Sequence, residues 1–334
     1  MRAMLLDRPG PVESSPLRLR EAPPPAPGPA EVLVKTRVCG ICRTDLHVIE
    51  GELPDARLPL IPGHQTVGIV EGVGPGVGSL RVGDRVGIAW LRQTCGVCRF
   101  CRSGRENLCR DAQFSGYHAN GGYAEYAVVP ESFAYPIPST FSDEEAAPLL
   151  CAGIIGYRAL RVSGIRPGHR LGLYGFGASA HIAIQIARAW GCEVFVCSLR
   201  EEHRLLAREL GAVWVGTAAE APPELLDAAI LFAPAGDLVP PALHALQRGG
   251  TLAVAGIHLS AIPPLDYTRD LFGERVLRSV TANTRQDGRD LLREAAAIPI
   301  RPHTQTYPLA DANRALQDLK RGAIRGAGVL RVAS

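Results

Sequence analysis

The chain of 334 residues is 46% hydrophobic, and its 36 basic and 33 acidic residues leave a formal net charge of +3. This length predicts two domains, and a nearly balanced charge without a long basic run argues against nucleic acid as a partner. No stretch reaches the roughly 18 apolar residues of a membrane span, and the start MRAMLLDRPG is too short for a signal peptide. We therefore expect a soluble cytoplasmic protein that does not enter a membrane.

Residues 1–140 predict a β-rich domain. Short runs such as EVLVKTRV, DRVGIAW and YAEYAVVP are separated by Gly and Pro, and no long helical pattern interrupts them. The stretch EAPPPAPGPA has the composition of a linker. Because strand-like segments flank it on both sides, we interpret it as a stiff loop inside this first domain.

Four cysteines in the segment TCGVCRFCRSGRENLC predict one metal site. They are Cys95, Cys98, Cys101 and Cys109. Thiolates suit a four-coordinate Zn²⁺, and four of them leave no position for a substrate, so the zinc would be structural. An iron–sulfur cluster or redox-active disulfides would use the same residues. In a reducing compartment, metal ligation explains nine cysteines better than disulfides do.

The pattern changes at Ser142. Ser142 and Glu145 have the spacing of a capping box, which predicts a helix that is interrupted near Pro148. Strand-like segments such as RLGLYGF, EVFVCS, VWVG, LDAAILFA and TLAVAGI then alternate with helical ones, among them ALHALQRG at residues 242–249. This alternation predicts a doubly wound parallel sheet. The tail adds a helix at LADANRALQDLKRG and a strand at GVLRVAS, and such a tail is able to complete the first domain.

The first strand-to-helix turn of the second domain has the spacing G-x-G-x-x-A. It comprises Gly175, Gly177, Ala178, Ser179 and Ala180. Glycines there let the backbone approach a pyrophosphate, and the following helix N-terminus stabilises its charge. This context predicts a dinucleotide-binding site.

The end of the next strand favours NADP over NAD. A carboxylate usually stands there and bonds the ribose of NAD, but this chain has Ser198, with Arg200 two residues later. A missing carboxylate removes repulsion toward a 2′-phosphate, and a guanidinium pairs well with one. The alternative is that Arg200 is simply a solvated residue at the start of a helix.

Cys42, His64 and Cys151 together form the donor set of a catalytic zinc, which keeps its fourth position open. Singly, each has a plainer interpretation, such as a small core residue for Cys151.

At this point the chain resembles the zinc-dependent alcohol dehydrogenases of the medium-chain dehydrogenase/reductase superfamily over essentially its whole length. The motifs that carry the resemblance are CGICRTDLH, PGH, the four-cysteine lobe, GGYAEY, LLCAG and YGFGASAHIAIQIA, in the order of the family. The resemblance implies a GroES-like catalytic domain of residues 1–149 and 286–334, with the structural zinc lobe at about residues 92–112. A Rossmann dinucleotide-binding domain of residues 150–285 would be inserted into it.

The resemblance also assigns roles. Cys42, His64 and Cys151 would ligate the catalytic zinc, which makes two zinc ions per chain, and Asp45 would orient the histidine ligand. Thr44 and His47 would relay the proton of the alcohol through the ribose of the cofactor, although a helix cap and a surface imidazole are their plainer interpretations. The implied cofactor contacts are Arg43, Gly175, Gly177, Ala178, Ser179, Ala180, Ser198, Arg200 and Arg285.

Three positions set this chain apart or bear on its substrate. Gln65 stands where the family usually has a glutamate beside the zinc, and Ala327 stands where many relatives place an arginine, for which Arg325 or Arg285 would compensate. Trp90 corresponds to a wall of the substrate pocket and would favour small or flat substrates, unless it is an ordinary core aromatic.

The expected function is hydride transfer between an alcohol and an aldehyde or ketone with a nicotinamide cofactor. The partners would be a small-molecule substrate and further copies of the chain, in a dimer or a tetramer. The alternatives are a non-catalytic NAD(P)-binding protein of the same fold and a related reductase that acts mainly on aldehydes.

Overall fold

The computed structural model describes residues 1–298 and 300–332. The chain divides into two compact units. Unit 1 takes in Met1–Cys151, Ala282–Ala296 and the chain from Pro302 onward, and unit 2 takes in Ala152–Thr281 and Ala297–Arg301. Among the described residues, no helix is both long and apolar enough to cross a bilayer.

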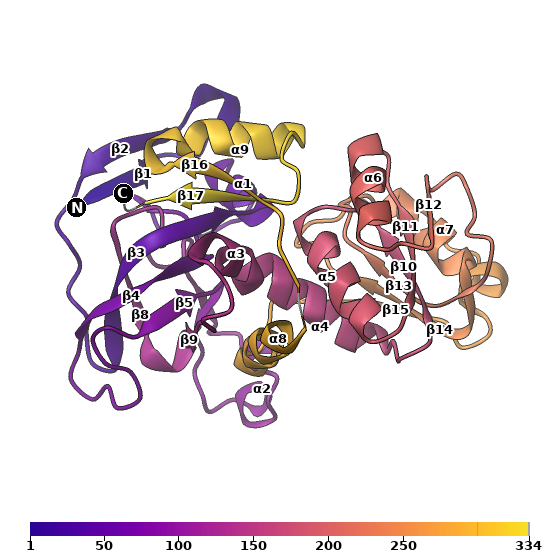
Figure 1. Cartoon of the computed structure of the whole chain (residues 1–334), viewed down its shortest axis with the longest axis horizontal. Coiled ribbons are helices and arrows are strands. Elements are labelled where there is room, and N and C mark those ends of the chain that lie inside the picture. The colour runs from indigo at the N-terminus through magenta and orange to yellow at the C-terminus, as the bar shows by residue number, and fades with distance from the viewer. Residues whose placement is uncertain (299, 333–334) are drawn as a thin grey trace. The chain divides into compact units, whose positions relative to one another are not determined.

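Unit 1 is built around a seven-stranded sheet that joins the two ends of the chain. Its strand order is β16-β17-β3-β4-β5-β9, and β8 also pairs with β3. These strands are β3 (Glu31–Ile41), β4 (Thr66–Val73), β5 (Arg85–Ile88), β8 (Tyr126–Pro130), β9 (Ala134–Pro136), β16 (Thr304–Pro308) and β17 (Ala327–Arg331). The C-terminal strand β17 runs antiparallel to β3, with Val329 opposite Gly40 (Figure 1). The tail thus completes unit 1.

Smaller elements complete unit 1. The strands β1 (Arg2–Leu6) and β2 (Leu17–Glu21) form a separate antiparallel pair, and the helices are α1 (Arg43–Ile49), α2 (Arg99–Arg102), α3 (Asp143–Pro148), α8 (Arg285–Ala297) and α9 (Ala312–Arg321). The proline-rich stretch is a loop between β2 and β3, as predicted.

The central strand β3 shows why this sheet has a core. Val32, Val34 and Val38 alternate along it and are buried, as expected for one covered face of a strand. Val32 and Val34 belong to the same apolar cluster as Phe133.

The predicted capping box at Ser142 is confirmed. Its hydroxyl accepts a hydrogen bond from the Glu145 backbone N–H at 3.2 Å, and the Glu145 carboxylate accepts one from the Ser142 N–H at 2.9 Å. The α3 helix then ends at Pro148, and one π-helical turn (Leu149–Gly153) leads into α4 (Ile154–Ser163). A proline removes a helical N–H donor, so an irregular turn beside it is expected.

Unit 2 contains a six-stranded sheet in which every neighbouring pair is parallel. The strand order is β12-β11-β10-β13-β14-β15, so the direction of winding reverses beside β10. The strands are β10 (Arg170–Tyr174), β11 (Glu193–Cys197), β12 (Trp214–Gly216), β13 (Leu226–Leu231), β14 (Leu246–Val254) and β15 (Val276–Ser279), and the further helices are α5 (Ala178–Ala189), α6 (Glu201–Glu209) and α7 (Val239–His244). In such sheets ligands bind at the carboxyl ends of the strands where the winding reverses.

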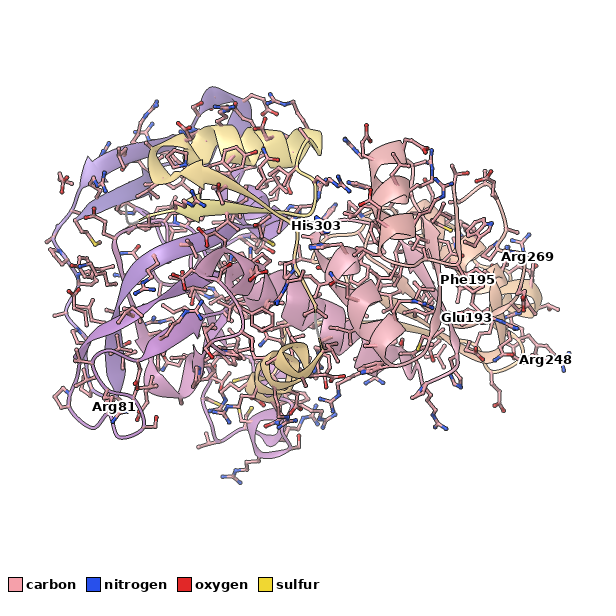
Figure 2. The ribbon with its side chains drawn as sticks, in the orientation of Figure 1. Arg81, Glu193, Phe195, Arg248, Arg269 and His303 are labelled. Atoms are coloured by element: carbon pink, nitrogen blue, oxygen red, sulfur yellow. The ribbon has the colours of Figure 1, made fainter. Side chains whose placement is uncertain are left out.

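Buried residues of the unit 2 sheet and of α7 form an apolar core. Phe195 on β11 belongs to this core, whereas Glu193, at the start of the same strand, is exposed (Figure 2).

One predicted helix is wrong in its second half. The sequence predicts a helix through residues 242–249, but α7 ends at His244 and β14 begins at Leu246. Leu246 is fully buried and pairs with Leu226 of β13. Burial and strand pairing therefore override the helical propensity of the segment.

Candidate active site

The four cysteines of the lobe lie together. The ligand atoms of Cys95, Cys98, Cys101 and Cys109 are all within 4.8 Å of one another, and all four residues are free cysteines. Adjacent Sγ atoms are 3.5 to 3.9 Å apart. A tetrahedron of sulfurs at about 2.3 Å from a zinc ion has edges of about 3.8 Å. The donor set therefore fits zinc.

The lobe is folded by local contacts that favour thiolates. The short strands β6 (Leu91–Gln93) and β7 (Gln113–Phe114) pair at its base. The backbone N–H of Cys98 lies 3.4 Å from Cys95 Sγ, and that of Cys101 lies 3.5 Å from Cys98 Sγ. The N–H of Cys101 is the main reason that the pKa of Cys98 falls to about 7. Such donors stabilise the deprotonated sulfur that a metal needs.

Cys42, His64 and Cys151 form a second group, with their ligand atoms also within 4.8 Å. Cys42 caps α1 directly after β3, His64 lies in the loop before β4, and Cys151 lies in the π-helical turn. The Sγ atoms of Cys42 and Cys151 are 3.8 Å apart. His64 is fully buried and its Nε2 atom has no hydrogen-bond partner among the described residues. A buried imidazole nitrogen without a partner beside two sulfurs fits a metal ligand.

Asp45 orients the histidine of this group. Its Oδ1 lies 3.0 Å from Nδ1 of His64, so the proton of the imidazole belongs on Nδ1 and Nε2 is left as a donor to metal. The other oxygen, Oδ2, accepts hydrogen bonds from the Cys42 N–H at 2.8 Å and from the Tyr123 hydroxyl at 3.1 Å. Tyr123 was not singled out by the sequence, since a tyrosine in GGYAEY gives no signal of its partner.

The two thiols of this group titrate unequally. The hydrogen bond from Cys151 is the largest cause that holds the pKa of Cys42 well below its usual range, with burial opposing it. The same contact and burial raise the pKa of Cys151 well above its usual range. The first thiolate therefore forms readily, and a metal ion would displace the second proton.

Thr44 and His47 follow Cys42 on α1. Thr44 is buried, with its Oγ1 at 3.7 Å from Cys42 Sγ. His47 is three residues on, so the two side chains share one face of the helix. Nδ1 of His47 pairs with the Glu52 carboxylate. Glu52 was not predicted, because nothing in the sequence distinguishes it from the neighbouring Glu50.

Trp90 is in contact with His64, the histidine of the group that also contains Cys42 and Cys151. Its ring is 9% exposed and meets the His64 ring edge-on, with centroids 4.9 Å apart. The indole also stacks on Phe114 at 4.8 Å and on Tyr117 at 5.8 Å. This stacking fixes the orientation of the indole beside the histidine. Gln65, the next residue after His64, is buried as well.

The glycine-rich turn has the backbone that the fingerprint requires. Gly175 follows β10 with a φ of +89°, and a Cβ there would lie 2.8 Å from the Ala233 nitrogen. Only glycine fits such a position. Gly177 caps α5, whose first turn holds Ala178, Ser179 and Ala180, and a Cβ at Gly177 would meet no atom within 4 Å. This open space is what close approach of a phosphate requires.

Ser198 and Arg200 follow β11, and two residues of α6 lie near them. The Ser198 hydroxyl is 3.5 Å from Nδ1 of His203, and the Ser198 carbonyl accepts a hydrogen bond from Arg204 at 2.7 Å. Arg200 is exposed and caps α6. The sequence did not single out His203 or Arg204, although Arg204 stands one helical turn after Arg200.

The two remaining predicted cofactor contacts belong to unit 1. Arg43 is exposed at the start of α1. The Arg285 N–H and Nε groups donate to the buried Glu106 carboxylate at 3.0 and 3.3 Å, and its guanidinium stacks on Phe133 at 4.8 Å. These two partners hold the Arg285 side chain within unit 1. A contact between Arg285 and a cofactor stays a prediction.

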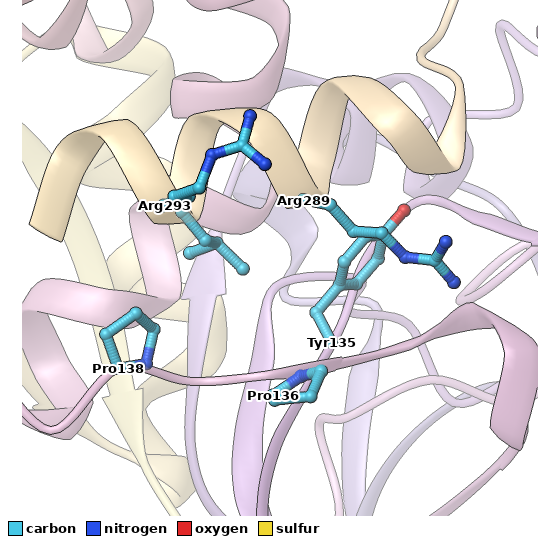
Figure 3. A pocket seen from close by; sticks show the side chains of 6 residues that line it. Tyr135, Pro136, Pro138, Arg289 and Arg293 are labelled. Atoms are coloured by element: carbon cyan, nitrogen blue, oxygen red, sulfur yellow. The ribbon is translucent and has the colours of Figure 1, made fainter. Parts of the chain in front are cut away.

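A cavity of about 230 Å³ in unit 1 contains none of the predicted site residues. Tyr135, Pro136 and Pro138 line one side, and Arg289 and Arg293 of α8 belong to the lining on the other (Figure 3). The hydroxyl of Tyr135 is buried and has no hydrogen-bond partner within the described part of the chain.

Comparisons with known proteins agree with this arrangement. The family described as alcohol dehydrogenase GroES-like domain matches residues 28–139, and the family described as zinc-binding dehydrogenase matches residues 180–297. The probable alcohol dehydrogenase AdhA of Mycobacterium tuberculosis is 55% identical, over 99% of this chain and 97% of its own. An alcohol dehydrogenase of Geobacillus stearothermophilus is 39% identical, over 95% and 96%.

Solved structures lead to the same family. The cobalt- and zinc-bound thermostable alcohol dehydrogenase of Pyrobaculum aerophilum has a TM-score of 0.88 at 32% identity, with 99% of each chain covered. These relatives do not favour a non-catalytic binding protein. The chain therefore belongs to the zinc-dependent alcohol dehydrogenases of the medium-chain dehydrogenase/reductase superfamily, with a GroES-like and a Rossmann domain, and is an oxidoreductase that transfers hydride between alcohols and a nicotinamide cofactor.

Proposed function

We propose that this alcohol dehydrogenase holds two zinc ions per chain. Cys42, His64 and Cys151 would hold the catalytic ion, and the four lobe cysteines would hold the structural one. The supporting observation is that the two donor sets share no residue, and that within each set the ligand atoms lie within 4.8 Å of one another. Elemental analysis of fully metallated protein tests this, and one zinc or fewer per chain would contradict it.

The chemistry at the three-ligand site would be alcohol oxidation and carbonyl reduction. A zinc ion with an open coordination position supplies Lewis acidity toward the substrate oxygen. The Thr44 hydroxyl would relay the proton of the alcohol, accepting it while passing its own proton on toward the cofactor ribose and His47; its burial, with Oγ1 at 3.7 Å from Cys42 Sγ, supports this role. His47 would receive the proton at Nε2, since Glu52 engages Nδ1.

Substrate size would be set in part by Trp90. The indole contacts the His64 ring and is held by the stack with Phe114 and Tyr117, so it has little freedom to move away from a substrate. We expect small or flat alcohols and aldehydes to react best. A panel of primary, secondary and aromatic alcohols, assayed with the parent and with Trp90→Ala, tests this. Equal profiles would make Trp90 an ordinary core residue.

The cofactor would be NADP rather than NAD. The support is the absence of a carboxylate at Ser198, together with Arg200 at the helix cap and the neighbouring His203 and Arg204. Positive and hydrogen-bonding groups at this strand end suit a 2′-phosphate. Steady-state assays with NADH and NADPH decide between the two cofactors.

The remaining assignments are also proposals. We propose a cytoplasmic homo-oligomer, dimeric or tetrameric, whose catalytic domain comprises residues 1–149 and 286–334 and whose cofactor domain comprises residues 150–285. Light scattering after size exclusion measures the oligomeric state. Limited proteolysis between the proposed domains tests the boundaries.

A further inference from the structure

We propose that Tyr123 is a positioning residue for the catalytic metal site, because its hydroxyl holds the Asp45 carboxylate in the orientation in which Asp45 fixes His64. This inference rests on the proposed metal site at Cys42, His64 and Cys151 and adds a residue that the reaction itself does not touch.

The two carboxylate oxygens of Asp45 have different hydrogen-bond partners. Oδ1 faces Nδ1 of His64 at 3.0 Å, and Oδ2 accepts the Tyr123 hydroxyl at 3.1 Å and the backbone N–H of Cys42 at 2.8 Å. In the described chain, Tyr123 is the one side chain that donates to Oδ2. A carboxylate anchored through Oδ2 keeps Oδ1 directed at the imidazole, and this fixes the histidine ring and its tautomer.

Tyr123 is itself held rigidly against the histidine loop. Residues 121–123 donate three backbone hydrogen bonds to the segment that precedes His64. These run from Gly121 to Ile61 at 2.7 Å, from Gly122 to Gly63 at 3.0 Å and from Tyr123 to Pro62 at 3.0 Å. The hydroxyl and the backbone of Tyr123 therefore reach both Asp45 and the loop that carries the metal ligand.

Gly63 makes room for the tyrosine ring. It has a φ of +99°, and a Cβ there would lie 2.3 Å from Cδ1 of Tyr123, closer than atoms can approach. The residue directly before the histidine is thus a glycine for both its backbone conformation and the ring packed against it. The phenol occupies a fixed place.

Burial favours the neutral form of the Tyr123 hydroxyl, which is the form that donates. Tyr123 is fully buried, and burial together with the negative charge of Asp45 raises its pKa well above the usual range. A neutral hydroxyl that donates to a buried carboxylate is a charge-assisted hydrogen bond. Its loss would leave Asp45 with a single donor on Oδ2.

The decisive variant is Tyr123→Phe, which removes the hydroxyl and keeps the ring against Gly63. The matched control is Tyr135→Phe, because Tyr135 is also buried in unit 1 and its hydroxyl has no hydrogen-bond partner among the described residues. Zinc release from the holoenzyme to an excess of chromogenic chelator is recorded over time. The Cys151→Ser protein, which lacks one ligand of the catalytic ion, identifies the phase that belongs to that ion.

We expect Tyr123→Phe to release the catalytic zinc about 10-fold faster, the low end of the range for losing a hydrogen-bond partner around a metal ligand. The structural zinc should leave at the parental rate, and Tyr135→Phe should match the parent in both phases. Parental release of the catalytic zinc from Tyr123→Phe would overturn the proposal, even if its melting temperature falls. If Cys151→Ser still binds two zinc ions, the catalytic site itself is misassigned.

A second comparison keeps the test valid if Tyr123→Phe is poorly folded. In the Asp45→Asn background the hydroxyl has no carboxylate to position, so adding Tyr123→Phe should not accelerate zinc release further. Fully additive effects of the two substitutions would mean that Tyr123 acts independently of Asp45, and would also overturn the proposal.

Discussion

The imidazole of His64 and the carboxylate of Asp45 are both buried and meet at 3.0 Å, between Nδ1 and Oδ1. Burial by itself would lower the pKa of His64, but Asp45 and Cys42 raise it to about 10. Asp45 thus gives the buried histidine a charged partner on the Nδ1 side, and metal binding at Nε2 would compete with protonation there.

The first prediction concerns this pair. Asp45→Asn keeps the size of the side chain but removes its charge, so zinc affinity at the catalytic site should fall about 10- to 100-fold. Zinc content after dialysis against a graded chelator measures this. Asp237→Asn, at an exposed position, is the control and should behave as the parent. Equal zinc retention in both variants would show that Asp45 is only a structural partner.

The two cysteine clusters should respond differently to loss of one thiol. Cys109→Ser should lower the melting temperature, because a structural zinc contributes folding free energy directly. Cys151→Ser should abolish turnover and leave the chain folded. Calorimetry and steady-state rates on both variants separate the roles. A melting temperature of Cys109→Ser equal to that of the parent would contradict a structural metal in the lobe.

The proton relay predicts a defect that depends on added base. His47→Gln should slow alcohol oxidation near neutral pH by about 10-fold or more, the typical cost of a lost general base. Small amine buffers should partly restore the rate. Glu52→Gln should have a smaller effect of the same kind, since Glu52 pairs with Nδ1 of His47 and does not take the proton itself. Unchanged rates for His47→Gln would remove Thr44 and His47 from the mechanism.

The preference for NADPH over NADH is tested by two substitutions. Ser198→Asp should reverse the preference toward NADH, because a carboxylate repels the 2′-phosphate and bonds the ribose hydroxyl. Arg200→Ala should weaken NADPH alone by roughly 10- to 150-fold in kcat/KM, the range of a charge-assisted hydrogen bond of about 1.5 to 3 kcal/mol. A parent that prefers NADH, with no effect of Arg200→Ala, would make the NADP assignment wrong.

Much of the fold follows from local chemistry in the sequence. The capping box at Ser142, the interruption near Pro148 and the glycine turn at Gly175 each depend on residues within a few positions, and the structure has all three. By contrast, α8 was not predicted, and β14 was mistaken in part for a helix. The burial of Leu246 depends on its partner strand, which local patterns do not report.

The candidate site divides in the same way. Ligand types and spacings in the sequence single out the two candidate metal-binding groups that the structure brings together, because few other roles suit such clusters. The same reasoning does not find three neighbours of the predicted site residues, Tyr123, Glu52 and His203. Each of these contacts a residue that is distant in the chain or is itself of a common type. Tyr123 is 78 residues from Asp45.

The pairing of β17 with β3 distinguishes the two cysteine groups by how much of the chain their surroundings require. The strand that leads into Cys42 pairs with β17, which lies far away in the sequence. The four lobe cysteines lie within 15 consecutive residues and depend on a local hairpin. The lobe can therefore fold from a short stretch of chain, whereas the sheet that leads into Cys42 gains its β17 neighbour only when a distant segment has been synthesised. A chain interrupted before β17 would keep the means to bring the four lobe cysteines together but would lack one strand of the unit 1 sheet.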